Sequence, residues 1–430
     1  MTLAPPHAEA FAELARTRSA TQSVSLLRST LHARRLLLLK ALLVRVHRQR
    51  DSVDPVVYRR FTEAWRLLER IERRHPAVVR DLLDYPTTGT WLATALNEPP
   101  GPLLDRHLAR LDLLAVTAAL RSGAPLDVTV DAPDGLLSLP GVGRLRTGPR
   151  AGHADRVRIR ARSRTVRIRP EGHARRPPVV LLLTDRRTGA LTGRGPGWTG
   201  LTVLSGSVAR LDDLDPYRVP PGGIGSPARD GTEHSATDRA AWSACWRSAQ
   251  TLLARTDPAR AAEVRRAVRA LVPLVPRGPG SSGATLSVAP GAVLTSLPSG
   301  AQDMAETLVH ELHHSKLATL HELVPLYLPG RAAVHRVGWR SDPRPIAGVL
   351  HGAYAHLALT DLWRRAGTAE SAPAPWRTSA GQQFDRIHDQ VGEALSILLE
   401  SDELTSEGRE FVHQMRRHHA SLGAAPRAAG

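Results

Sequence analysis

The 430-residue sequence predicts an α+β protein that is mostly helical, with a β-rich segment in the middle of the chain. Apolar residues recur at three- and four-residue spacing before residue 122 and again after residue 238, as expected for helices with one buried face. Between residues 126 and 219, short β-branched runs alternate with polar residues and are separated by Gly, Pro and Asp, which is typical of strands. Apolar residues make up 42% of the chain and charged residues 23%, so we expect a folded core rather than disorder.

These patterns divide the chain into five segments. We predict an N-terminal helical region at 1–125, an arginine-rich β segment at 126–219, a polar linker at 220–237, a helical region at 238–420 and a disordered tail at 421–430. Within the fourth segment, helices are predicted at 238–256 and 258–275. A hairpin or edge strand at 283–298 and four more helices follow.

The sequence excludes several classes of protein. Cys245 is the only cysteine, which rules out an intramolecular disulfide and a zinc site built on thiolates. The first 19 residues lack a basic stretch followed by an apolar run, so no secretory signal peptide is predicted. The longest apolar run, Leu36 to Val44, is shorter than the roughly 20 residues that a bilayer span requires. We therefore expect a cytoplasmic protein with no membrane partner.

The chain carries a net charge of +17, and nearly all of its basic residues are arginine. Twelve arginines lie between Arg144 and Arg176, where Asp155 and Glu171 are the only acidic residues. From Arg156 to Arg160 the arginines occupy one face of a predicted strand and the aliphatic residues occupy the other. Such a face is either solvated or a docking surface for an acidic peptide. Base readout in nucleic acid is not expected, because no aromatic residue interleaves the arginines.

The most informative motif is His310-Glu311-Leu312-His313-His314, which has the pattern HExxH. Residues four positions apart lie on one face of a helix, so His310 and His314 can bind one metal ion together. The run from Met304 to Leu320 contains neither Pro nor Gly, which favours a helix here. We predict a metal site with these two ligands. The alternative is a surface helix whose histidines are hydrogen-bonded.

A catalytic metal needs a third protein ligand, with other positions left open. The metzincin pattern fails, because Leu317 and Leu320 stand at its glycine and third histidine positions. His321 lies about 10 Å further along a continuous helix, which is out of reach. A thermolysin-like zinc site would use a downstream glutamate, for which Glu370 and Glu393 are available.

A better third ligand lies in a second predicted helix, which starts at Pro345 and runs to about residue 364. His351 sits next to Gly352, whose missing side chain would let another backbone or a ligand approach closely. His356 is five residues further on and would point roughly the opposite way, so we do not expect both histidines to serve. We predict His351 as the third ligand and keep His356 as the alternative.

Two stretches, TLVHELHHSKLATL and WRSDPRPIAGVLHGAYAH, resemble the HExxH-motif family found beside ribosomally synthesised peptide natural products, and DYPTTGTWL resembles a weaker N-terminal element of it. That family is described as 2-oxoglutarate-dependent peptide β-hydroxylases. The resemblance implies an Fe(II) site held by His310, His314 and His351. It also implies a cation for the distal carboxylate of 2-oxoglutarate, for which Arg340, Arg344 and Lys316 are our candidates.

We therefore expect an Fe(II)/2-oxoglutarate oxygenase that hydroxylates a β-carbon in a precursor peptide. The basic strands would recruit an acidic leader of that peptide, and a radical SAM maturase would be a pathway partner by family analogy. Glu311 distinguishes two mechanisms. In a zinc metallopeptidase it would be the general base, whereas in an oxygenase it would orient a ligand or a water, or bind the metal itself. A third alternative is a non-catalytic basic module that binds peptide or RNA.

Overall fold

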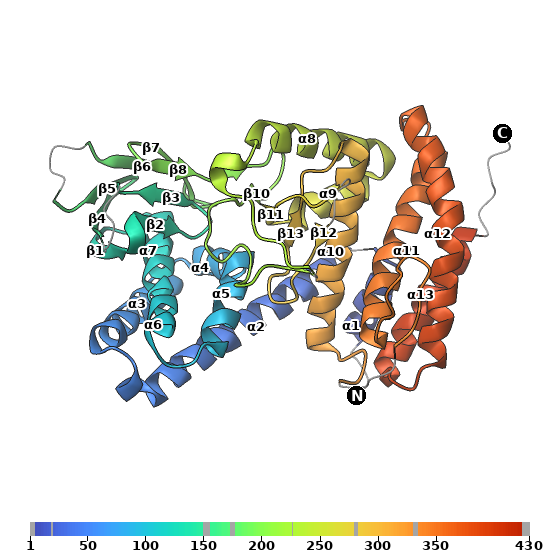
Figure 1. The fold of residues 1–430 in the computed structure, drawn as a ribbon, viewed down its shortest axis with the longest axis horizontal. Helices are drawn as coiled ribbons and strands as arrows, with labels where there is room; N and C mark the ends of the chain where they lie inside the picture. The colour runs from blue at the N-terminus through green and yellow to red at the C-terminus, as the bar shows by residue number, and fades with distance from the viewer. Residues whose placement is uncertain are drawn as a thin grey trace. The chain divides into compact units, whose positions relative to one another are not determined.

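The computed structural model of the chain describes residues 5–18, 20–148, 155–172, 177–225, 227–278, 283–329 and 334–423 (Figure 1). Helices account for 57% of the structure and strands for 16%, which confirms a mixed and mostly helical protein. The predicted change from helices to strands is also observed, because the seventh helix ends at Ser122 and the first strand begins at Leu126. Within the described ranges, no helix has both the length and the apolar character needed to cross a bilayer.

The described residues form thirteen α-helices and thirteen strands, labelled in Figure 1. The helices are α1 Pro5–Ala15, α2 Thr21–Arg48, α3 Pro55–Arg74, α4 Pro76–Leu83, α5 Pro86–Asn97, α6 Pro102–Leu108, α7 Arg110–Ser122, α8 Arg239–Thr256, α9 Pro258–Ala267, α10 Ala301–Leu323, α11 Ile346–Thr368, α12 Ala374–Glu400 and α13 Ser406–Gly423. The strands are β1 Leu126–Ala132, β2 Leu136–Leu139, β3 Gly143–Arg146, β4 Asp155–Arg162, β5 Thr165–Pro170, β6 Val179–Asp185, β7 Ala190–Arg194, β8 Trp198–Gly200, β9 Thr202–Val203, β10 Arg210–Leu211, β11 Ala270–Pro273, β12 Gly283–Ala284 and β13 Ala292–Thr295.

The chain divides into two compact units that combine the predicted segments differently. Unit 1 comprises 1–31, 204–209 and 238–430, and unit 2 comprises 32–203 and 210–237. The predicted N-terminal helical region therefore contributes to both units, and the predicted linker belongs to unit 2. The predicted tail is helical as far as Gly423, because α13 extends that far, and residues 424–430 lie outside the described part of the chain.

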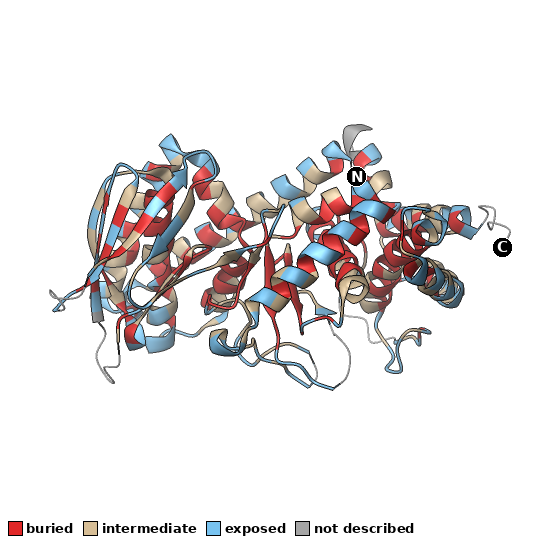
Figure 2. Cartoon of the chain, turned by 90° about the horizontal axis from the view of Figure 1, so that it is seen from above, coloured by how far each residue is buried: buried red, intermediate tan, exposed pale blue. Residues whose placement is uncertain are grey.

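Unit 1 is built around α10, the helix that carries the HExxH motif. α10 packs against α8 and α11, α11 packs along α12, and α13 packs against α12 and α1. Figure 2 shows that buried residues form continuous stripes along these helices, while the opposite stripes are exposed. α10 and α11 are therefore each packed against more than one neighbouring helix, which fixes the residues of the motif.

A short sheet in unit 1 corrects one predicted helix. α9 ends at Ala267, and residues 270–273, which were assigned to the end of that helix, form β11 instead. β11 pairs in parallel with β13, and all four of its residues are buried. Such a strand is apolar on both faces, so its short run lacks the alternation that separates a strand from a helix. The predicted hairpin is confirmed, because β12 pairs antiparallel with β13.

Unit 2 contains an antiparallel sheet in the order β1-β4-β5-β6-β7 and a smaller sheet in the order β2-β3-β8. In β4 and β5 the aliphatic residues are buried, and α7 contributes Val116 and Leu120 to the same core. Arginines alternate with them on the other face, as the sequence predicts.

The start of α3 in unit 2 is fixed by an N-cap followed by proline. The Asp54 carboxylate accepts hydrogen bonds from the backbone N–H groups of Val56 and Val57.

Candidate metal centre

The HExxH motif lies on one uninterrupted helix, as predicted. α10 runs from Ala301 to Leu323 without glycine or proline inside it. Its first turn carries Asp303, which accepts a hydrogen bond from the backbone N–H of Ser299 at 2.9 Å and is favoured there by the helix dipole. His310 and His314 therefore occupy one face, one turn apart.

The two histidines point their Nε2 atoms at each other. These atoms are 3.0 Å apart, and the ring centroids are 4.7 Å apart at an interplanar angle of 79°. Two nitrogen ligands about 2.1 Å from one ion are separated by about 3.0 Å at a right angle and about 3.4 Å at the tetrahedral angle. The pair thus already has the separation that two ligands of a single ion would show.

Burial keeps both imidazoles neutral. It lowers the pKa of His310 well below the ordinary value of 6.5, with a further contribution from His314. It lowers the pKa of His314 to about 3, with contributions from His351 and His356. A neutral imidazole has one unprotonated nitrogen, which is the form that binds a metal.

α11 brings both of its candidate histidines to this pair. His356 meets His310 edge-on with ring centroids 5.1 Å apart, and the ring of His351 lies 5.7 Å from that of His314. Pro345 precedes the helix, which starts at Ile346, and both histidines line the same pocket, each beside a different motif histidine. That the two cannot both serve as ligands stays a prediction.

His356 is held in a metal-binding orientation. Its Nδ1 lies 2.8 Å from the Gly352 carbonyl oxygen, so the proton belongs on Nδ1 and the Nε2 lone pair is free. Burial lowers its pKa to about 4, partly offset by this hydrogen bond. Burial, followed by the charge of His321, also lowers the pKa of His351 to about 4. Burial thus keeps both α11 imidazoles neutral near neutral pH.

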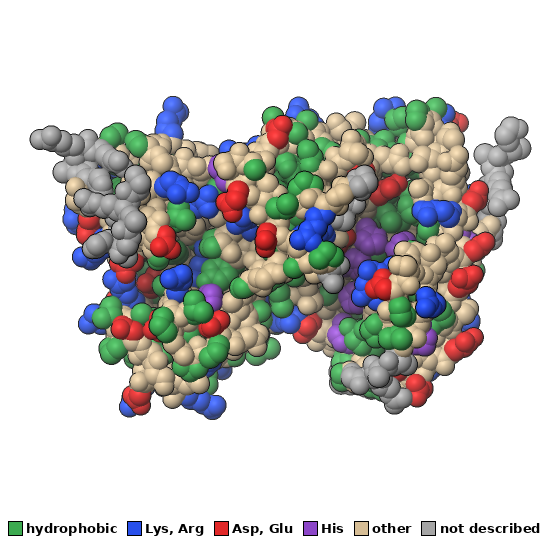
Figure 3. Space-filling model, in the orientation of Figure 1, with side chains coloured by type: hydrophobic (Ala, Val, Ile, Leu, Met, Phe, Trp, Pro, Cys, Tyr) green, Lys and Arg blue, Asp and Glu red, His purple; other side chains and the backbone are tan. Residues whose placement is uncertain are grey.

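The four histidines line a pocket of about 420 Å³, together with Trp339, Arg340, Arg344, Gly348 and Gly352. Figure 3 shows histidine side chains gathered in a hollow of unit 1, with cationic and acidic side chains beside it. Trp339, which sequence reasoning missed, stacks on His356 with ring centroids 4.5 Å apart. A Cβ at Gly352 would lie 3.0 Å from its indole, so the group that approaches this glycine closely is a tryptophan side chain and not the predicted backbone or ligand.

Arg340 and Arg344 lie where a co-substrate carboxylate could reach them. Both line the pocket, and both bind Asp342, through Arg340 Nε at 2.9 Å and Arg344 Nη2 at 3.0 Å. The hydrogen bond from Arg340, with the charges of both arginines, lowers the pKa of this exposed carboxyl. Because Asp342 is about half exposed, burial does not prevent another carboxylate from replacing it as the partner of the two arginines.

Lys316 does not line the histidine pocket, which corrects its prediction as a carboxylate-binding residue. Its ammonium is buried and donates to Glu263 Oε1 at 2.7 Å. Burial, against the charge of Glu263, lowers its pKa to about 8. Lys316 is six residues from His310, which places it on the opposite side of the helix. Its rarity in an arginine-rich chain therefore does not mark it as a pocket residue.

Glu311 also lies away from the pocket lining. Its carboxylate is buried and accepts a hydrogen bond from Thr285 Oγ1 at 2.6 Å. A Cβ at Gly283 would collide with this carboxylate, so β12 presses directly against it. Glu311 thus anchors α10 to the edge of the short sheet, and its carboxylate is not among the groups that surround the histidines.

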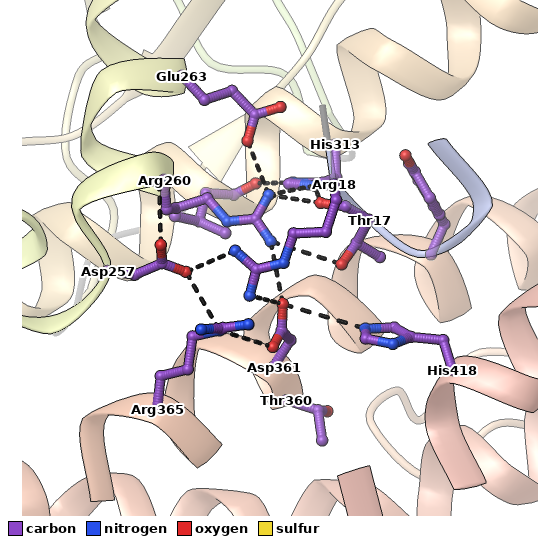
Figure 4. A network of polar contacts seen from close by, with 12 residues as sticks. Thr17, Arg18, Asp257, Arg260, Glu263, His313, Thr360, Asp361, Arg365 and His418 are labelled. Carbon is purple, nitrogen blue, oxygen red and sulfur yellow. Dashed lines mark hydrogen bonds and ion pairs between the residues drawn. The ribbon is translucent and has the colours of Figure 1, made fainter. Parts of the chain in front are cut away.

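The other face of α10 holds His313 in a network of ion pairs (Figure 4). Its Nδ1 donates to the Val309 carbonyl oxygen, and its Nε2 accepts from Arg260 Nη1 at 3.1 Å. Arg260 is fully buried and also binds Glu263 at 2.7 Å and Asp361 at 3.4 Å. His313 is therefore a structural residue, although it belongs to the same motif as His310 and His314.

A second layer of the network connects more distant segments of unit 1. Arg18, which follows α1, binds both Asp257 at the start of α9 and Asp361 on α11. Arg365 binds the same two carboxylates, and His418 of α13 approaches Asp361 (Figure 4). These contacts fix α9, α10, α11 and α13 together behind the histidine pocket.

His321, which was expected to be out of reach, and the two glutamates considered for a zinc site lie elsewhere. His321 accepts a hydrogen bond from the Leu326 N–H and stacks on Tyr327, and Glu370 and Glu393 are not among the residues that line the pocket. In the described part of the chain, no three His, Cys, Asp or Glu side chains converge closely enough to hold a metal ion as they stand. His310 and His314 therefore remain a pair of candidate ligands.

Comparisons with known proteins identify no family: no protein-family model and no curated protein matches this chain. The residues of the pocket and the sequence resemblance are therefore the features that indicate a function.

Proposed function

We propose that the chain is an Fe(II)/2-oxoglutarate-dependent oxygenase that hydroxylates a β-carbon of a ribosomally synthesised peptide. The observation that carries the proposal is the composition of the pocket wall. It contains four neutral imidazoles and two guanidinium groups, and no carboxylate of the described residues lines it. This wall suits a metal ion together with an anionic co-substrate.

His310 and His314 would hold the iron with one imidazole of α11. His356 is favoured over His351, because its Nδ1 is fixed by a backbone carbonyl and because it perturbs the pKa values of both motif histidines. With a metal–nitrogen distance of about 2.1 Å, the ring centroids of two such ligands lie about 4.6 Å apart at a right angle and about 5.3 Å at the tetrahedral angle. The separations from His310 to His314 and to His356 fall in this range.

The charge of the site favours a dianionic co-substrate. Three neutral imidazoles would leave the full +2 charge of the ion, and Arg340 and Arg344 add two more positive charges at the rim. A 2-oxo dicarboxylate would offset the charge of the ion and the charge of the arginines together. One end would bind the metal, and the distal carboxylate would bind an arginine fork. Iron bound here would supply the activation of O₂ with 2-oxoglutarate as the reductant.

The position of the Glu311 carboxylate favours the oxygenase over the zinc metallopeptidase. A peptidase of this type needs the motif glutamate beside the metal-bound water as general base. Here the carboxylate is turned to Thr285 and β12 instead. Its role in the proposal is to set the position of α10, and therefore of His310, the residue that precedes it.

The proposal is tested by anaerobic reconstitution of the full chain with Fe(II), followed by addition of 2-oxoglutarate. We expect a visible metal-to-ligand charge-transfer band that is absent from the His310→Ala variant. The variant His47→Ala, which removes an exposed histidine of α2, is the matched control and should keep the band. Iron binding without a band, or zinc binding with cleavage of added peptides, would reject the oxygenase.

The third ligand is assigned by comparing His356→Ala with His351→Ala under the same conditions. We expect the first substitution to lower Fe(II) affinity the more. A larger loss in His351→Ala would assign that residue instead, as the sequence alone predicts. Exposure of the loaded protein to O₂ should then release succinate from 2-oxoglutarate, which is measured by mass spectrometry with and without peptide.

A further inference from the structure

The outer face of the β4–β5 pair in unit 2 carries an ordered array of arginines. Arg158 stands directly opposite Arg169 and Arg160 opposite Arg167, while the aliphatic residues between them are buried. Arg162 extends the row on β4. These five side chains line a groove of about 780 Å³. The predicted arginine-rich segment also includes Arg150, Arg175 and Arg176, which lie outside the described residues.

The described residues neutralise this array only in part, and Glu171, which pairs with Arg156, is the acidic residue that lines the same groove. Asp127 on β1 binds Arg158 at 2.8 Å and Arg160 at 3.1 Å, so one carboxylate serves two cations. Within the described ranges, no carboxylate pairs with Arg162, Arg167 or Arg169. Like charges directly opposite each other on an antiparallel pair are destabilising. The sheet therefore carries a cost that an acidic partner would relieve.

The flanking strand indicates which acidic partner fits. Val180 and Leu182 of β6 stand opposite Arg167 and Thr165 and therefore share their face. Leu182 is 49% exposed, so an apolar contact adjoins the arginines. None of the five strands of this sheet contains an aromatic residue on which a base could stack. Charge beside aliphatic surface fits a peptide, and the missing aromatics disfavour nucleic acid.

We infer that this face of β4 and β5, with Leu182 beside it, is a docking surface for an extended acidic peptide segment. Side chains two residues apart on a strand are about 6.6–6.8 Å apart, and an extended peptide repeats its own alternate side chains at the same interval. Carboxylates at every second position can then meet successive arginines of one row. If the proposed function holds, the segment belongs to the substrate peptide, but the surface itself requires nothing of the histidine pocket.

The test uses the full chain and a fluorescein-labelled peptide of twelve alternating Glu and Thr residues, followed by fluorescence anisotropy at low salt. The variant is Arg167→Gln/Arg169→Gln, which breaks no ion pair. The matched control is Arg416→Gln/Arg417→Gln, which removes the same charge from an exposed position of α13. We expect binding at least fivefold weaker in the first variant and unchanged in the second, with affinity that falls as salt is added.

Three results would overturn the inference: no binding of the peptide by the unmodified chain at low salt, an equal loss in the α13 control, or equally tight binding of a twelve-residue oligothymidylate. The last result would assign the face to nucleic acid. Failure of this inference can be told apart from failure of the proposed function. The variant Arg167→Gln/Arg169→Gln should keep the Fe(II)/2-oxoglutarate band. Conversely, His310→Ala should lose that band and still bind the peptide.

Discussion

The two faces of α10 use the same residue type in opposite ways. On one face, the side chains of His310 and His314 are hydrogen-bonded to each other and to no further side chain of the described residues, and both line a pocket. On the other face, His313 has both ring nitrogens hydrogen-bonded within a buried network of ion pairs. The comparison teaches that the chemistry of a histidine depends on which lone pairs the fold leaves free. Three histidines within five residues thus divide into two candidate ligands and one structural residue.

The largest effect should come from the pocket face. His314→Ala removes one of the two positioned ligands, so we expect the affinity for Fe(II) or Zn(II) to fall by more than the roughly 10–100-fold that loss of a supporting contact costs. Stability should change little, because the substitution breaks no bond to the rest of the fold other than the one to His310. Competition with a chromophoric chelator measures the affinity. An unchanged affinity would remove the distinction between the two faces.

Substitution in the network should have the opposite outcome. Arg260→Met leaves Glu263 and Asp361 as buried carboxylates with fewer partners, so we expect the free energy of unfolding to fall by about 3–5 kcal/mol. Urea unfolding followed by circular dichroism gives the change. Arg247→Met, at an exposed position of α8, is the control and should stay within about 0.5 kcal/mol. A similar small change in Arg260→Met would show that the network contributes no stability.

His313→Ala tests the comparison at the motif itself. It removes one acceptor from the buried donors of Arg260 and Lys316, which keep Glu263, so we expect a loss of about 1–3 kcal/mol in the free energy of unfolding. Metal affinity, measured as for His314→Ala, should stay within a few-fold of the unmodified chain because His313 does not line the pocket. Loss of metal binding at full stability would place His313 among the ligands.

The smallest effect that we expect concerns how the free energy of unfolding depends on pH. Burial lowers the pKa of His351 to about 4, whereas an unfolded histidine titrates near 6.5, so the unfolded chain binds more protons between these values. The metal-free protein should therefore lose stability as the pH falls from 6.5 toward 4. Burial alone would raise the pKa of the Glu263 carboxyl, but Lys316 and Arg260 lower it well below its ordinary value of 4.5. The contribution of Glu263 is thus lost only below pH 4.5.

Melting temperatures of the metal-free protein between pH 7 and 4.5 measure this slope. His351→Gln should reduce it, and His47→Gln, at an exposed position, should leave it unchanged. An identical slope in the unmodified chain and in His351→Gln would show that the buried imidazole is already protonated.

The HExxH helix and the pairing of His310 with His314 could be predicted because both depend on spacing along one helix. That both His351 and His356 line the pocket could not be predicted, because it depends on how α10 packs against α11 rather than on the angle between the two side chains around α11. Lys316 was misassigned for a similar reason. Its partner Glu263 lies 53 residues away in sequence, and no local pattern indicates that contact. Trp339 lies in a connection without periodicity, where sequence reasoning has little to use.

The stack of Trp339 on His356 depends on the glycine at 352, since the indole fills the volume that a methyl group would need. Positions 339 and 352 are therefore not free to change independently during evolution. A relative with a larger residue at 352 should carry a smaller one at 339, and its pocket should lack this aromatic wall. Paired variation at these two positions would therefore show which relatives keep the aromatic wall of the pocket.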